Sequence, residues 1–304
     1  MRLRFWGARS RPVDDLGDGL RELRRPRAEG DVGHALRAPS PLHAFNRYEI
    51  KYLVDHSQVP ALRRELTGRL DLDPYGADGG YGVWSVYYDT TRLRFYWEKV
   101  EGIRFRRKLR IRHYGDRFTV DDGAPVFVEI KQRVNRVTQK RRIRLSYRDA
   151  IRLCDGRCPP PAGDTDDAFV AEVLGLLVGL DLRPVVTTGY QREAFLGRDA
   201  DVGLRVTLDN RVRGRDRDFS LSSDAVNRFI VPPRYAVLEV KANDRVPYWL
   251  TDLTARCNLS VVRLSKYCQG IETFGRAPRS VFHVHDHDDG AGSFEPATAQ
   301  CLEA

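Results

Sequence analysis

The amino-acid sequence predicts an α+β fold: an eight-stranded antiparallel β-barrel that forms a tunnel with a charged lumen, with helices packed outside. Eight segments alternate between charged and apolar residues, as strands with two different faces do. The charged faces recur on nearly every strand and are mostly cationic, so the usual arrangement of a solvated outer face over an apolar interior explains them poorly. The longer gaps between strands show helical spacing of apolar residues, so helices can cover an apolar exterior.

The elements follow in order along the chain. The eight strands are predicted at 46–54, 83–89, 103–114, 125–133, 138–147, 185–197, 201–210 and 234–242. Turn residues separate neighbouring strands, for example Gly115 and the segment from Gly197 to Asp201, so hairpins are expected. Helices are predicted at 57–70, 164–180, 247–259 and 265–274, where apolar residues recur on one helical face.

Three of these strands share the signature Glu-apolar-Lys, at Glu49–Lys51, Glu129–Lys131 and Glu239–Lys241. Side chains alternate along a strand, so each Glu and Lys point to the same face. A fourth strand carries cations at every second position: Arg104, Arg106, Lys108, Arg110 and Arg112. Cations so close together repel each other unless a polyanion lies among them. The charged faces therefore predict a binding site for condensed phosphate.

The net charge supports an anionic partner. The chain carries a formal charge of +9, and the segment 101–148 alone has 15 Lys/Arg against 5 Asp/Glu. The rest of the chain is therefore close to neutral. A basic patch of this kind is typical of proteins that bind nucleic acid, an anionic membrane or polyphosphate.

Composition also suggests how the chain is organised and where it acts. We expect a disordered or loose N-terminal arm at 1–43, a folded tunnel domain at 44–276 and a disordered tail at 277–304. The longest apolar run is about a dozen residues and contains Glu172, which is too short and polar for a membrane span. The Arg-rich N-terminus has no apolar signal core. A cytoplasmic location is therefore expected.

Eight motifs, in this order, resemble the VTC polyphosphate polymerase domain of the triphosphate tunnel metalloenzyme superfamily. They are Arg47–Tyr52, Tyr87–Thr90, Leu109–Gly115, Val128–Lys131, Tyr190–Phe195, Arg205–Asp209, Leu238–Lys241 and Leu264–Tyr267. Singly they are weak, but eight in order over about 46–274 are specific. The resemblance implies an eight-stranded tunnel, in agreement with the strand count. It also implies an enzyme that transfers the γ-phosphoryl group of ATP to a polyphosphate chain with a divalent metal, Mn²⁺ or Mg²⁺.

The resemblance also implies residue roles. The cations expected to act in catalysis are Lys51, Arg110, Arg112, Lys131, Arg192, Arg205 and Lys266. Further phosphate-binding residues are expected at Arg104, Arg106, Lys108, Lys140, Arg142, Lys241 and Ser265. Arg offers paired donors to phosphate and Lys a point charge. Glu239 is expected to be the main metal ligand, assisted by Glu49 and Glu129, since hard cations prefer carboxylate oxygens. Glu49 and Glu129 could instead only neutralise neighbouring cations.

Two other functions stay open. A metal-dependent tripolyphosphatase or nucleoside triphosphatase would use the same tunnel and pass the phosphoryl group to water. A non-catalytic protein that binds RNA or another polyanion would also explain basic strands with interleaved aromatic residues. Carboxylates on the charged faces argue against this, so no specific nucleic acid is expected as a partner beside ATP and inorganic polyphosphate. Eukaryotic members of the family carry membrane helices, so a separate membrane partner is expected where synthesis is coupled to translocation.

Overall fold

The computed structural model describes residues 47–277 apart from 77–78, 136, 162–165 and 244. The arm predicted at 1–43, and the tail predicted at 277–304 apart from Ala277, lie outside the described residues. In the part of the chain that is described, no helix has the length and apolar character needed to cross a membrane.

The described residues form one antiparallel sheet of 11 strands at the centre of the fold. Neighbouring strands follow the order β11-β1-β10-β8-β7-β3-β4-β5-β6. The long strands are β1 (Arg47–Asp55), β3 (Tyr81–Asp89), β4 (Phe105–Tyr114), β5 (Pro125–Val134), β6 (Val137–Ser146), β7 (Arg183–Leu196), β8 (Arg205–Arg215) and β10 (Tyr235–Asn243). All eight predicted strands are therefore confirmed. The remaining strands are two residues each and were not predicted: β2 (Asp71–Leu72), β9 (Arg228–Phe229) and β11 (Ser260–Val261).

The largest shifts from predicted boundaries are at β8, which begins at Arg205 instead of residue 201 and ends at Arg215 instead of residue 210. The alternation of apolar residues already starts at Val202, but Asp199–Asp201 form a short 3₁₀ turn. Gly203 then adopts a φ of +99°, a left-handed conformation through which a strand does not continue. The backbone thus delays the strand even though the side-chain pattern suits it.

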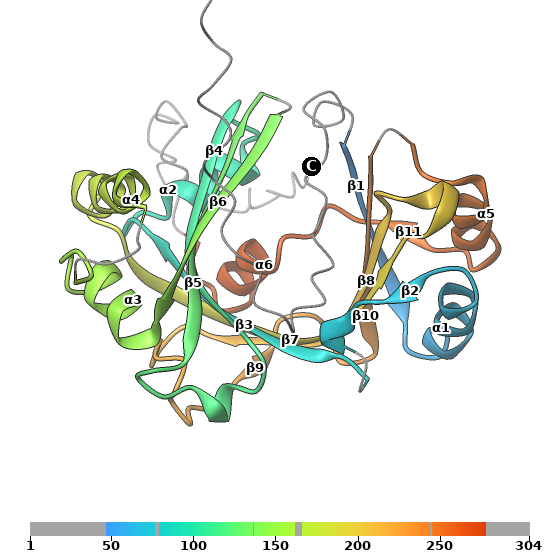
Figure 1. Cartoon of the computed structure of the whole chain (residues 1–304), viewed down its shortest axis with the longest axis horizontal. Coiled ribbons are helices and arrows are strands. Elements are labelled where there is room, and N and C mark those ends of the chain that lie inside the picture. Colours follow the sequence, from blue (N-terminus) through green and yellow to red (C-terminus); the bar gives the residue numbers. More distant parts are fainter. Residues whose placement is uncertain (1–46, 77–78, 136, 162–165, 244, 278–304) are drawn as a thin grey trace, which may run out of the picture. The chain divides into compact units, whose positions relative to one another are not determined.

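The sheet is curved but does not close in the part of the chain that is described. One wall consists of β4, β5 and β6 and the other of β8, β10 and β1, with β3 and β7 between them (Figure 1). β6 and β11 are the two edges, so the closed eight-stranded barrel is not confirmed. Side chains still meet across the open side, since Glu49 of β1 and Lys131 of β5 are 3.6 Å apart. We call the concave side of this sheet the groove.

Helices cover the outer face of both walls. They are α1 (Val59–Thr67), α2 (Arg94–Val100), α3 (Tyr147–Cys154), α4 (Asp167–Gly179) and α5 (Tyr248–Arg256). The outer side chains of β4 and β5, such as Leu109 and Ile130, are buried in one core with residues of α3 and α4. Those of β8 and β10, such as Leu208 and Leu238, share a second core with α1 and α5. Burial of these apolar faces stabilises the curved sheet and leaves the charged faces to the groove.

The helix α6 (Lys266–Thr273) lies inside the curve of the sheet (Figure 1), so the prediction that the helices pack outside does not hold for it. Its Ile271 and Cys268 pack against Val186 of β7 and Tyr87 of β3. A glycine allows this close approach: a Cβ at Gly270 would lie 2.9 Å from Cγ2 of Val186. The helix α6 therefore fills part of the concave side.

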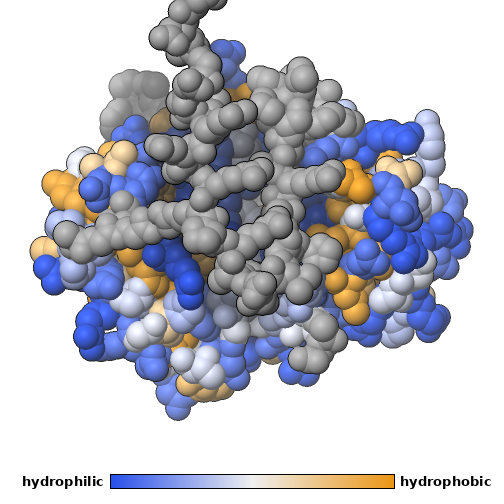
Figure 2. All heavy atoms as spheres, viewed as in Figure 1, coloured by the Kyte–Doolittle hydropathy of each residue, from blue (hydrophilic) through white to orange (hydrophobic). Residues whose placement is uncertain are grey.

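On the face shown in Figure 2, most of the described residues are hydrophilic, and the hydrophobic ones form separate patches. One exposed hydrophobic residue on the outside is Val178 of α4. Scattered apolar residues of this kind are normal for a protein surface.

Candidate active site

The strand register places the predicted cations together on the groove side. Lys51 of β1 lies opposite Glu239 of β10. On the other wall, Arg110 of β4 lies opposite Glu129 of β5. Side chains alternate along a strand, so every second residue from these positions points to the same face of the sheet. The groove cations are Lys51, Lys108, Arg110, Arg112, Lys131, Lys140, Arg142, Arg192, Arg205, Lys241 and, from α6, Lys266.

Two further predicted phosphate-binding residues lie at the start of the cation row of β4, Arg104 just before the strand and Arg106 within it on the same face as Lys108. The carbonyl of Arg104 accepts a hydrogen bond from the backbone N–H of Asn135, next to the β5–β6 turn. Arg106 donates through Nε to the carbonyl of Ile103 at 2.7 Å. The structure therefore brings Lys108, Arg110 and Arg112 into the groove, whereas the side chain of Arg106 donates to the backbone at the start of this row.

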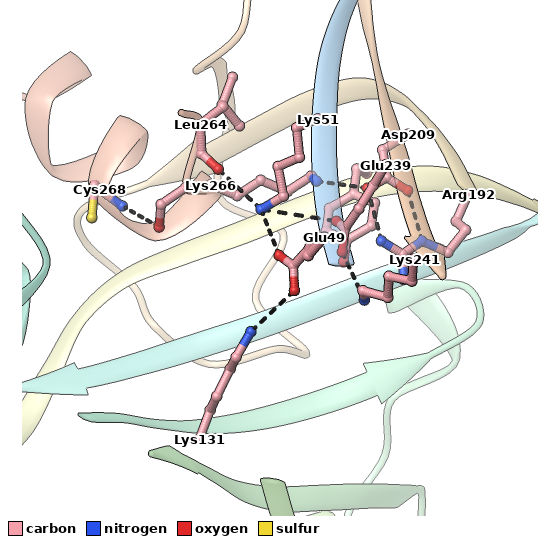
Figure 3. A network of polar contacts seen from close by, with 12 residues as sticks. Glu49, Lys51, Lys131, Arg192, Asp209, Glu239, Lys241, Leu264, Lys266 and Cys268 are labelled. Atoms are coloured by element: carbon pink, nitrogen blue, oxygen red, sulfur yellow. Dashed lines mark hydrogen bonds and ion pairs between the residues drawn. The ribbon is translucent and has the colours of Figure 1, made fainter. Parts of the chain in front are cut away.

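A first ion-pair cluster joins β1 and β10 (Figure 3). Nζ of Lys51 lies 3.2 Å from Oε1 of Glu49 and 3.9 Å from Oε2 of Glu239. Nζ of Lys241 lies 2.7 Å from Oε1 of Glu239. Burial opposes ionisation of Glu49, but Lys131 and the other lysines nearby lower its pKa to about 2. The pKa of Glu239 is likewise held well below its usual value, against its burial, by Lys241 and Lys51. Both carboxylates are therefore ionised at neutral pH.

A second cluster surrounds Glu129, whose side chain is almost fully buried. Arg110 donates to its Oε2 through Nε at 2.7 Å, and Nζ of Lys140 lies 2.6 Å from its Oε1. Burial raises the pKa of Glu129, but Arg110, Arg112 and Lys140 outweigh this and lower it to about 2. The carboxylate thus links a cation of β4 to a cation of β6. A metal ion at Glu129 would have to displace both.

A third cluster is centred on Asp209 of β8, which is fully buried. Arg192 of β7 donates to both of its oxygens, at 2.7 and 2.8 Å, and Nζ of Lys266 donates to Oδ2 at 2.6 Å. Burial raises the pKa of Asp209, but Arg192 and Lys266 hold it below its usual value. The sequence places Asp209 on the polar face of its strand without a role. Its alternation with Arg205 and Thr207 is the signal that could have marked it as a groove residue.

The segment Leu264–Tyr267, which we call the closing segment, contacts a different strand with each of its four residues. The carbonyl of Leu264 accepts from Lys51 of β1 at 3.0 Å, and Oγ of Ser265 accepts from Lys108 of β4 at 2.7 Å. Lys266 donates to Asp209 of β8, and the hydroxyl of Tyr267 donates to Asp89 at the end of β3. Because Ser265 also caps α6, the predicted phosphate-binding serine lies at the start of a helix inside the groove.

Groove tyrosines are functional candidates that the sequence did not single out. Arg110 donates through Nη1 to the hydroxyl of Tyr87 at 3.0 Å, and Arg112 donates through Nη2 to that of Tyr190 at 3.4 Å. Burial raises the pKa of Tyr87, but Arg110, Arg112 and Lys108 outweigh it and lower the pKa to about 7. The two tyrosines thus orient two guanidinium groups, and the positive charges of the groove favour the ionised form of Tyr87.

The pair Glu49 and Glu239 has the chemistry for a divalent metal. Both are ionised, both contact Lys51, and Oγ1 of Thr207, which lies opposite Glu239 on β8, is buried without a hydrogen-bond partner. Within the described residues, no group of three or more His, Cys, Asp or Glu is close enough to hold a metal. Mg²⁺ is commonly bound by one or two carboxylates together with substrate phosphates. The residues therefore fit a metal that arrives with a phosphate ligand, not a metal held by the protein alone.

Comparison with known proteins places these observations in a family context. The family model described as the VTC domain matches residues 46–274. The vacuolar transporter chaperone complex subunit 4 of Trypanosoma brucei brucei is 28% identical over 279 residues, which cover 77% of this chain and 35% of that protein. The subunit of the same name from Trypanosoma cruzi is 28% identical over 232 residues, which cover 66% of this chain and 29% of that protein. The chain thus spans about a third of the length of these relatives.

A solved structure, that of a putative adenylate cyclase from Bacillus halodurans, aligns with a TM-score of 0.44 and 15% identity. The alignment covers 75% of this chain and 98% of that one. This similarity is too low to assign the chain to that class of protein.

Proposed function

Because the chain belongs to the VTC domain family, we propose that it is a polyphosphate polymerase that transfers the γ-phosphoryl group of ATP to a polyphosphate chain. The observation that carries the proposal is the composition of the groove. Cations from both walls and from α6 converge on the same side as two ionised carboxylates, Glu49 and Glu239. Anionic phosphates would be attracted to the cations, and a metal bound with them would be attracted to the carboxylates.

The groove residues suit this chemistry because phosphoryl transfer needs little covalent help. Its transition state is loose, with negative charge spread over the equatorial oxygens, so catalysis consists mainly of positioning and charge stabilisation. Arg110 and Arg112, fixed by Tyr87 and Tyr190, would donate to the phosphate oxygens. Lys51 and Lys266 would add point charges. No nucleophilic side chain of the protein is required.

Glu239 and Glu49 would hold Mn²⁺ or Mg²⁺, with phosphate oxygens as the remaining ligands. When bound, such an ion neutralises charge on the transferred phosphoryl group and its leaving group. Without it, Lys51 lies between the two carboxylates and offsets their mutual repulsion, since it contacts both. Glu129, predicted as a further metal ligand, would on this proposal mainly orient Arg110 and Lys140.

The names of the relatives bear on the partners of this chain. Both are subunits of a vacuolar transporter chaperone complex. Part of our proposal is therefore that this chain works with a separate membrane partner and acts in the cytoplasm, where ATP is supplied. ATP and inorganic polyphosphate would be its substrates.

The test is a product analysis with the purified chain, ATP labelled at the γ-phosphate, and Mn²⁺ or Mg²⁺. A polymerase gives a ladder of labelled polyphosphate with ADP formed in proportion. Release of labelled orthophosphate without polymer would instead show a hydrolase. Absence of turnover together with salt-sensitive RNA binding would show a polyanion-binding protein. Lys51→Ala should lose turnover, whereas Arg148→Ala, at an exposed ion pair with Asp122 outside the groove, is the control that should keep it.

A further inference from the structure

Asp209 connects two proposed phosphate-binding cations that come from different elements, Arg192 of β7 and Lys266 of α6. We propose that Asp209 is a positioning residue of the reaction, which holds these two cations as one preorganised phosphate-binding unit. The inference rests on the proposed function, because it assigns a task to Arg192 and Lys266 in that reaction. It concerns a residue that ends the motif Arg205–Asp209 but to which the sequence assigns no role.

The geometry fixes both cations in different ways. The two parallel hydrogen bonds from Arg192, through Nε and Nη2, hold the plane of the guanidinium group. The single bond at 2.6 Å to Lys266 holds a flexible side chain at its charged end. The ring of Tyr190 lies beneath both, with its centroid 5.1 Å from Cζ of Arg192 and 4.6 Å from Nζ of Lys266. The two charges therefore have a shared acceptor on one side and a shared aromatic surface on another.

Asp209 acts through these partners and not directly on a substrate. Its side chain is fully buried, and both oxygens already accept hydrogen bonds from cations. One negative charge against two positive charges leaves an excess of one positive charge for an incoming phosphate. Without the carboxylate, two cations in a poorly solvated site would repel each other and separate. Since Lys266 is also the first residue of α6, Asp209 sets the position of the closing segment against the sheet.

The central experiment compares Asp209→Asn with the wild-type chain in turnover and in binding of inorganic tripolyphosphate. The amide has the same shape but no charge, so Arg192 and Lys266 lose their common partner. We expect kcat to fall on the order of 10- to 100-fold, as misplaced catalytic groups do. We expect the affinity for tripolyphosphate to increase, because one negative charge is removed from the groove; an unchanged affinity would overturn the proposal. A parallel loss of kcat and affinity would overturn the proposal.

A matched control separates positioning from general structure. Glu98 is a buried carboxylate on the outer face, 2.6 Å from Nη2 of Arg107. Glu98→Gln removes the same charge from the same kind of ion pair. We expect this variant to have a lower thermal stability, but not a lower kcat with an unchanged or higher tripolyphosphate affinity. A fall in kcat without a fall in affinity in the Glu98 variant would overturn the proposal.

If Asp209→Asn does not fold, Asp209→Glu replaces it. The longer side chain keeps the charge but shifts both cations, so a wild-type kcat in a folded Asp209→Glu variant would also overturn the proposal.

A double-mutant cycle tests whether Asp209 works through Lys266. Asp209→Asn is made alone and in a Lys266→Ala background, and tripolyphosphate affinity and kcat are measured for each variant. We expect strong non-additivity, with Asp209→Asn having a much smaller effect once Lys266 is gone. Additive effects would overturn the proposal. The binding arm does not need turnover, so a chain that binds tripolyphosphate with this coupling but makes no polymer would refute the proposed function alone.

Discussion

Three acids of the groove share the signature Glu-apolar-Lys but differ in what surrounds them. Glu129 is enclosed by Arg110 and Lys140, and only about 1% of its side chain is exposed. Glu49 has 36% of its side chain exposed and lies between two lysines at more than 3 Å. Glu239 is nearly buried, and among the described residues its close ion pair is the one with Lys241. Oε2 of Glu239 lies 3.9 Å from Nζ of Lys51. A metal ion could therefore bind this oxygen of Glu239 and break fewer close contacts than at the other two acids.

This difference leads to a prediction for Glu239→Ala. We expect metal-dependent turnover to fall at least on the order of 100-fold, because the main proposed metal ligand is removed. Tripolyphosphate binding in the presence of a chelator should be unchanged or tighter, since Lys51 and Lys241 lose their negative neighbour. Labelled ATP measures the first quantity and calorimetric titration the second.

Glu65→Ala, at an exposed position of α1, is the control and should retain both properties. Wild-type turnover in Glu239→Ala would contradict the metal role. A loss of tripolyphosphate affinity in the chelator would show instead that Glu239 organises the cations, as Glu129 does.

At the scale of elements, the closing segment compensates for the open sheet. Strand β1 and the opposite wall share no backbone ladder in the described residues, yet Lys51 of β1 and Lys108 of β4 both bind the closing segment. Ser265 is central to this arrangement. Its Oγ accepts from Lys108 and from the backbone N–H of Cys268, so one hydroxyl both caps α6 and connects a wall of the groove.

Two substitutions at Ser265 should separate its capping role from its binding role. Ser265→Ala removes the cap and should lower the free energy of unfolding by about 1 kcal/mol. Ser265→Asp keeps a good cap and gains an ion pair with Lys108, so stability should be retained. It also places a negative charge where phosphate is proposed to bind, so tripolyphosphate affinity should fall more than in Ser265→Ala. Chemical denaturation and calorimetric titration measure the two quantities; the opposite ranking of affinities would contradict a phosphate site at Ser265.

The sequence predicts the strands of this fold well because a strand's period of two leaves a clear mark when one face is charged. All eight long strands, and the parity that turns Lys51, Arg110 and Glu239 to one side, follow from alternation alone. The same pattern does not show that the sheet stays open, because closure depends on curvature and on pairing between strands far apart in the chain. The side of the sheet on which α6 lies is equally hidden, since an amphipathic helix can cover either face.

The sequence predicts which residue types line the candidate site, but not which of these residues contact one another. Cations on one face could be identified from spacing, whereas their partners depend on the register of strands and on the position of α6. Asp209 shows this limit. Its partners Arg192 and Lys266 lie 17 and 57 positions away from it along the chain, and no local sequence pattern links the three residues.

At the scale of the whole molecule, the groove concentrates charge that opposes folding. Its cations exceed its carboxylates, and several are poorly solvated, so the folded state contains repulsion that the unfolded chain avoids. Lys131 shows the effect even though 42% of its side chain is exposed: partial burial and the nearby Lys241, Lys108 and Lys51 lower its pKa to about 8, although Glu49 opposes this shift. A site that binds polyphosphate tightly is thus expected to lower the stability of the empty protein, and phosphate should restore it.

Lys131→Gln tests this opposition between binding and stability. The pKa of Lys131 is lower in the folded than in the unfolded chain, so its charge destabilises the fold at neutral pH. The variant should therefore be more stable than the wild type at pH 7 and bind tripolyphosphate more weakly. Between about pH 8 and about pH 10.5 the unfolded wild type binds more protons, so its stability should rise towards that of the variant.

Thermal unfolding at pH 7 and at pH 10 measures this convergence, and titration with tripolyphosphate over the same range measures binding. Wild-type affinity should decrease above about pH 8 as Lys131 loses its proton. Lys131→Arg is the control, because a guanidinium group keeps its charge over this range and should remove the part of the decrease that Lys131 causes. A Lys131→Gln variant less stable than the wild type at pH 7 would show that the contact with Glu49 across the open side of the sheet outweighs the repulsion among the groove cations.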